Sequence, residues 1–99
     1  TGNVQMARSE LFGHSKGAFT GAVRDRKGLL EQADGDSLFL DEVADLDRDP
    51  QRLLMAALEG RGFHRLGDPK RRYSSFRLIC ATNRPVRTFK RFAKTWPRV

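Results

Sequence analysis

Two adjacent carboxylates, Asp41 and Glu42, directly follow residues 37–40, a short run with the character of a buried strand. A nearly continuous apolar run of this length is typical of a strand that is covered on both faces, as in a parallel sheet. Ligands of open α/β sheets bind just beyond the carboxyl ends of such strands. Packing explains the two acids poorly, because Asp and Glu are seldom buried without partners.

Nucleotide hydrolysis is the chemistry that this pair of acids fits. Asp41 at a strand tip can hold Mg²⁺, directly or through water, and the metal neutralises charge on the phosphates. Its neighbour Glu42 can orient or deprotonate the attacking water. If the pair is considered alone, the simpler interpretation is a strand that ends in a solvated acidic turn.

A second predicted strand, residues 76–81, also ends in polar residues, Thr82 and Asn83. Between the two strands, an apolar stripe predicts a helix that begins near Asp47 and ends before Gly60. Strand, helix and strand in this order predict a parallel crossover, so Asn83 would emerge at the same sheet edge as the two acids. There its amide could touch a γ-phosphate or the attacking water. The alternative is a simple cap for a following helix.

The elements around these strands are shorter. Apolar spacing predicts a helix over residues 4–12, and residues 28–33 resemble a single helical turn. Residues 62–69 are typical of one arm of a hairpin and its turn, with a partner in the region 71–75.

Residues 13–22 contain three glycines and one isolated aromatic, Phe19, which predicts a loop rather than a regular element. Two interpretations of this loop remain open. Phe19 can be tucked into the core below a turn, or a mobile loop can offer Phe19 and Thr20 to another protein.

The composition allows one small domain or a piece of a larger one, since the chain has 99 residues with 38% hydrophobic and 31% charged. The net charge of +7 is concentrated near the end. Residues 1–83 hold 13 Lys and Arg residues against all 12 acidic ones, a balance of +1. The remaining positive charges are Arg84, Arg87, Lys90, Arg91, Lys94 and Arg98.

The basic segment that follows residue 84 is interleaved with Phe89, Phe92 and Trp96. This mixture suits nucleic acid, because bases stack on aromatics and phosphates pair with cations. It equally suits an amphipathic helix that lies on the body, or a chain end that is not native sequence.

The single cysteine, Cys80, cannot form an intrachain disulfide and is expected to be a reduced core thiol in a cytoplasmic protein. Its spacing from His14 and His64 does not predict a zinc site. The sequence shows no signal peptide, and its longest apolar run, residues 53–58, is too short to span a membrane.

Three stretches together carry a family resemblance: Ser9-Glu10-Leu11-Phe12-Gly13-His14 followed by Gly17-Ala18-Phe19-Thr20-Gly21-Ala22, then Leu38-Phe39-Leu40-Asp41-Glu42, and finally Cys80-Ala81-Thr82-Asn83-Arg84. They resemble the central AAA+ ATPase domain of bacterial enhancer-binding proteins, the activators of sigma-54 RNA polymerase. The hexapeptide at residues 17–22 is close to diagnostic of that family.

The resemblance implies roles for individual residues. Asp41 and Glu42 match the Walker B acids, for Mg²⁺-ATP and for activation of water, and Asn83 matches the sensor I residue. Residues 17–22 match the loop that contacts sigma-54 in a nucleotide-dependent manner. Arg65 lies in the region 63–75, which matches the second insertion loop.

The fold implied is α/β, part of a P-loop NTPase (AAA+) parallel sheet with flanking helices and two insertion loops. The implied function is ATP hydrolysis, with ATP and Mg²⁺ as cofactors, coupled to remodelling of the sigma-54 polymerase to activate transcription. The implied partners are sigma-54 RNA polymerase, further copies of the chain in a ring, and DNA through a domain that is absent here. No membrane partner is implied.

The chain also departs from the family pattern. It contains no G-x-x-x-x-G-K-[ST] phosphate-binding loop and no arginine-finger pattern after Asn83. We therefore expect residues 1–84 to be a partial sigma-54 interaction domain that lacks the Walker A loop and the lid, inactive alone, and residues 85–99 to be a divergent basic tail. Two rival functions are a small basic nucleic-acid-binding module and a non-catalytic fragment that retains only the sigma-contacting loop.

Overall fold

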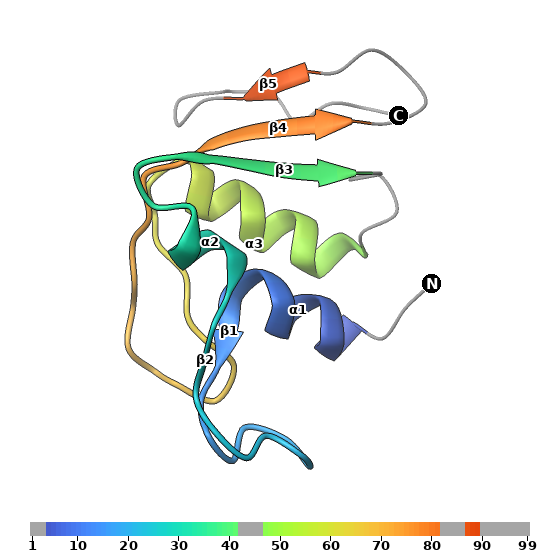
Figure 1. Cartoon of the computed structure of the whole chain (residues 1–99), viewed down its shortest axis with the longest axis vertical. Coiled ribbons are helices and arrows are strands. Elements are labelled where there is room, and N and C mark those ends of the chain that lie inside the picture. The colour runs from blue at the N-terminus through green and yellow to red at the C-terminus, as the bar shows by residue number, and fades with distance from the viewer. Residues whose placement is uncertain (1–3, 42–46, 82–86, 90–99) are drawn as a thin grey trace.

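The computed structural model describes residues 4–41, 47–81 and 87–89 (Figure 1). Its helices are α1 (Val4–Phe12), α2 (Leu29–Gln32) and α3 (Arg48–Leu58). Its strands are β1 (Gly13–His14), β2 (Arg26–Lys27), β3 (Ser37–Asp41), β4 (Arg77–Ala81) and β5 (Arg87–Phe89). The three predicted helical segments and both predicted strands are confirmed.

The larger sheet has the order β3-β4-β5. β3 and β4 are parallel, with Leu38 opposite Leu78 and Asp41 opposite Ala81. Because α3 connects them, the predicted strand–helix–strand crossover is confirmed (Figure 1). β5 is antiparallel to β4 and was not predicted, since three residues are too few to show the alternation that marks a strand.

All three helices lie on one face of this sheet (Figure 1). Leu38, Leu78 and Cys80 point into a core that they share with helical residues such as Leu30 and Leu54. Phe39 points the other way and is 56% exposed. The expectation that this strand is covered on both faces is therefore wrong for the described residues, which place no element over the face that carries Phe39.

α3 forms where the apolar stripe predicts it. Leu54, Ala57 and Leu58 are buried, and Gly60, with φ of +85°, follows its C-terminal end. Asp47 occupies the N-cap position, but its side chain makes no capping hydrogen bond. Among the described residues, no helix has the length and apolar character needed to cross a bilayer.

Two loops extend from the helical side, away from the sheet (Figure 1). The first loop, residues 15–25, connects β1 and β2, which pair with Gly13 opposite Lys27. The second loop, residues 62–75, is held by an antiparallel bridge between Phe63 and Arg72. This bridge confirms the predicted pairing of the two arms of a hairpin.

Candidate functional site

The carboxylate Asp41 is the last residue of β3 and is exposed at the carboxyl end of the parallel pair. This is the sheet edge at which α/β folds bind ligands. Glu42 and Asn83, the other two residues predicted for this edge, lie outside the described residues. Within the described part of the chain, no group of three or more His, Cys, Asp or Glu side chains is arranged to hold a metal ion.

The nucleotide site is therefore incomplete in these residues. Asp41 has the oxygen donor that Mg²⁺ prefers. The sequence, however, has no glycine-rich loop to supply backbone N–H groups and a Lys to the phosphates. One carboxylate alone does not make an ATP site.

The first loop carries the Gly17–Ala22 hexapeptide in a compact turn. The N–H of Gly17 donates to the carbonyl of Ala22 at 2.8 Å, and the N–H of Ala22 donates to the carbonyl of Phe19 at 3.0 Å. At the base of the loop, the N–H of Lys16 donates to the Asp25 carboxylate at 2.8 Å. Local backbone hydrogen bonds therefore close the hexapeptide into a turn, and Thr20 is exposed.

The structure does not support the interpretation that Phe19 is tucked into the core, and the interpretation as a contact for another protein stays a prediction. It is half-buried and does not belong to the hydrophobic core. Its ring packs edge-on against the imidazole of His14, with 5.0 Å between the ring centroids. The Phe19 ring therefore packs against the base of the first loop.

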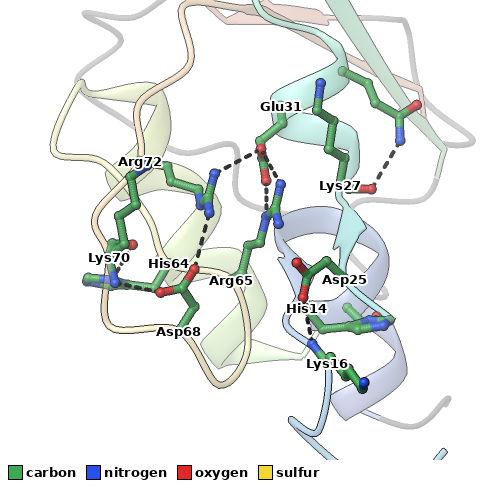
Figure 2. Close-up of polar contacts among 12 residues, drawn as sticks. His14, Lys16, Asp25, Lys27, Glu31, His64, Arg65, Asp68, Lys70 and Arg72 are labelled. Carbon is green, nitrogen blue, oxygen red and sulfur yellow. Dashed lines mark hydrogen bonds and ion pairs between the residues drawn. The ribbon is translucent and has the colours of Figure 1, made fainter. Parts of the chain in front are cut away.

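The second loop is anchored to α2 by ion pairs (Figure 2). The guanidinium of Arg65 donates two hydrogen bonds to Glu31, at 2.8 Å from Nε and 2.9 Å from Nη2. Arg72 lies 3.5 Å from the same carboxylate and 3.2 Å from Asp68. The side chains of Arg65 and Glu31 are only 11% and 12% exposed, so this two-point pair is largely shielded from water.

These contacts shift the acid–base equilibria of the cluster. The hydrogen bonds from Arg65 hold the pKa of Glu31 below its ordinary value, although burial opposes the shift. Glu31 in turn raises the pKa of Arg65. The pKa of Asp68 is lowered by the backbone N–H of Lys70 first and by Arg72 second. These shifts keep Glu31, Arg65 and Asp68 charged at neutral pH.

Glu31 belongs to the ion pairs that anchor the second loop, but no pattern in the sequence predicted a role for it. It lies in a four-residue helix, where an acid normally faces solvent. Its partner Arg65 is 34 residues away in the chain. No local pattern connects two such positions, and only the tertiary structure brings them together.

The two loops also contact each other. The N–H of Ser15 donates to the carbonyl of Leu66 at 2.9 Å, and the N–H of Leu66 donates to the carbonyl of Gly13 at 2.9 Å. Further along, Gly67 has φ of +76°, and a Cβ atom placed on it would lie 2.7 Å from the Cβ of Ala18 in the hexapeptide. The second loop therefore forms one side of the support for the first.

Comparison with known proteins agrees with this arrangement. Residues 2–94 match the family model described as the Sigma-54 interaction domain. The chain is 52% identical over 79 residues to the anaerobic nitric oxide reductase transcription regulator NorR of Vibrio vulnificus, covering 80% of this chain and 16% of NorR. It is 50% identical over 78 residues to the Nif-specific regulatory protein of Azospirillum brasilense, covering 79% of this chain and 12% of that protein.

A solved structure is similar too. The crystal structure of NtrX from Brucella abortus superposes with a TM-score of 0.70 at 34% sequence identity, covering 83% of this chain and 18% of NtrX. The chain thus spans about a sixth or less of the length of the curated relatives above. With its α/β fold, parallel strand pair and two loops, the chain belongs to the Sigma-54 interaction domain family.

Proposed function

We propose that this chain is the sigma-54-contacting portion of an ATP-dependent activator of transcription. The observation that carries the proposal is the position of the hexapeptide: Gly17–Ala22 lies in a loop that extends from the helical side, away from the sheet (Figure 1). A large apolar ring and an exposed hydroxyl on a projecting loop suit a protein interface better than catalysis.

The nucleotide chemistry would belong to the other end of the structure. In a complete regulator, Asp41 would supply a ligand for Mg²⁺, Glu42 would orient the attacking water and Asn83 would contact the γ-phosphate. ATP supplies the free energy, and a ring of subunits would complete each site. The contribution of this chain is to hold the Asp41 carboxylate at the sheet edge and to link that edge to the loops.

Such a link is supported by continuous contacts. Glu31 lies on α2, which leads through a short turn into β3 and so toward Asp41. The carboxylate of Glu31 holds Arg65, whose neighbour Leu66 hydrogen-bonds to both Gly13 and Ser15 at the base of the first loop. A displacement of β3 would therefore reach the base of the first loop through one helix, one ion pair and the backbone hydrogen bonds of Leu66.

The interface role is tested with Phe19→Ala and Thr20→Ala in a complete regulator. We expect both variants to lose capture of sigma-54 in the presence of ADP–aluminium fluoride, a transition-state analogue, while ATP hydrolysis is retained. Val23→Ala is the matched control, because Val23 is 69% exposed beside the hexapeptide but outside it.

Thermal melts distinguish interface loss from unfolding. Truncation of a core Phe costs roughly 3–5 kcal/mol, and Phe19 lies outside the core, so a smaller loss of stability is expected. Sigma-54 capture that persists in Phe19→Ala, together with a strongly lowered melting temperature, would reject the proposal.

The nucleic-acid-binding alternative rests on the basic segment 85–99, which lies outside the described residues except for the backbone of Arg87–Phe89. Arg65 and Arg72, two of the cations of the second loop, are engaged with Glu31 and Asp68 inside the protein. They are not free to pair with phosphates. A steep dependence of DNA affinity on salt concentration would nevertheless favour that alternative.

A further inference from the structure

Ser9 and His14 form a buried polar pair directly beneath Phe19. We propose that they are positioning residues, which hold Phe19 against the body of the domain until it engages sigma-54. This inference rests on the proposed function and extends it, because it assigns a restraint to two residues outside the hexapeptide.

The imidazole of His14 is fixed from several sides. Its Nδ1 atom is hydrogen-bonded to Ser9 Oγ at 2.7 Å, and the two residues are only 8% and 4% exposed. The backbone of His14 pairs with Arg26 on β2 and bridges to Leu66 in the second loop. The ring therefore has a defined place and orientation, set by α1, β2 and the second loop together.

Phe19 is held in place much more weakly than His14. Its ring meets His14 at an interplanar angle of 73°, an edge-to-face arrangement that aromatic rings favour. Beside the contact lies a hollow of about 750 Å³, lined by residues of α1 including Met6 and Glu10 and by Thr20. The ring is thus supported on its His14 side and borders open space, instead of being enclosed by the core.

The strength of such a contact suits a reversible restraint. An aromatic edge-to-face pair changes an equilibrium by about twofold to tenfold beyond its burial. That is enough to favour the seated ring in the free protein, and a partner that binds the released ring can overcome it. A partner that needs the part of the Phe19 ring in contact with His14 must compete with His14, so loss of the His14 ring should favour binding.

Two substitutions separate the parts of the restraint. His14→Asn keeps a polar group that can bond to Ser9 but removes the aromatic ring, whereas His14→Phe keeps a ring for Phe19 and loses the bond to Ser9. Each is made in the complete regulator, and the Kd for sigma-54 is measured without nucleotide and with ADP–aluminium fluoride. Val23→Ala serves as the control for a substitution elsewhere in the first loop.

Without nucleotide, we expect His14→Asn to bind sigma-54 about twofold to tenfold more tightly than the wild type. With the analogue, the Phe19 ring should already have left its contact with His14. His14→Asn and the wild type should then bind sigma-54 with the same Kd. Without nucleotide, His14→Phe should bind sigma-54 more tightly than the wild type but less tightly than His14→Asn, because its ring still contacts Phe19 but is no longer held by Ser9. If His14 has a purely structural role, His14→Asn should instead weaken the binding of sigma-54 in both conditions, because a disordered loop binds more weakly. That result would overturn the inference.

A second measurement does not depend on sigma-54. In a double-mutant cycle of His14→Asn and Phe19→Ala, chemical denaturation should show effects on the unfolding equilibrium constant that are non-additive by about twofold to tenfold. If the wild type fails to bind sigma-54 in any nucleotide state, the proposed function is wrong and this cycle alone decides the restraint. Additive effects would then refute it.

Discussion

Glu31 and Arg65 face each other across the junction between α2 and the second loop, with two hydrogen bonds of 2.8 and 2.9 Å joining one carboxylate to one guanidinium. This two-point geometry is more directional than a single contact, and Lys cannot reproduce it. Because Arg72 also approaches Glu31, a single acidic residue holds both arms of the second loop (Figure 2).

Glu31→Gln should destabilise the fold. The amide loses the charge that pairs with Arg65 and Arg72, and leaving a largely shielded donor poorly paired costs about 1–3 kcal/mol or more when the donor is charged. Asp49→Asn is the control, since it breaks an ion pair with Arg52 whose side chains are 63% and 69% exposed, and such pairs contribute about 0–1 kcal/mol. Urea denaturation of both variants checks the difference. Equal effects would show that the Glu31 cluster contributes no more than a surface pair.

The contribution of Glu31 should also depend on pH. Its pKa in the folded state lies below the ordinary value of 4.5, so between the two values the unfolded chain binds more protons than the folded one. Stability from this group is therefore fully present above pH 4.5 and is lost as the pH falls through the folded-state pKa. Denaturation midpoints of the wild type and Glu31→Gln should converge as the pH is lowered below 4.5. A constant difference down to strongly acidic pH would contradict the assignment.

Gly67 and Gly35 offer a matched pair of substitutions. Both have positive φ, +76° and +79°, so replacement by Ala carries a similar conformational cost of about 1–2 kcal/mol. Only at Gly67 does the added Cβ meet another atom, the Cβ of Ala18 at 2.7 Å, whereas Gly35 faces open space. We expect Gly67→Ala, and not Gly35→Ala, to weaken sigma-54 capture by displacing the hexapeptide. Equal capture by both variants would show that contact between the loops does not position residues 17–22.

Substitutions of the adjacent acids Asp41 and Glu42 should separate binding of ATP from its hydrolysis. In a complete regulator, Glu42→Gln should retain nucleotide binding but lower turnover by roughly 10²-fold or more, because the proposed role of Glu42 is to orient the attacking water. Asp41→Ala should impair Mg²⁺-dependent binding as well. Phosphate release and nucleotide affinity, measured side by side, test both statements. Unchanged turnover in Glu42→Gln would remove the proposed role of that residue.

The sequence by itself determined the local elements and their order. The apolar stripe of Leu54, Ala57 and Leu58 predicts α3, and the run that ends at Asp41 predicts β3, because helical and strand periodicities depend on a few neighbouring residues. The crossover then requires β3 and β4 to be parallel, as observed. The hexapeptide Gly17–Ala22 predicted the family, since its residue types are distinctive without any knowledge of their contacts.

Only the tertiary structure decided which distant groups meet. Glu31 and Arg65 pair across 34 residues, and His14 receives Phe19 because β1, α1 and the second loop fix its imidazole. Phe39 is exposed, although its apolar neighbours suggested cover, because all three helices lie on the opposite face of the sheet. Ion pairs, aromatic contacts and burial depend on how whole elements pack, and periodicity within one element carries no information about its partners.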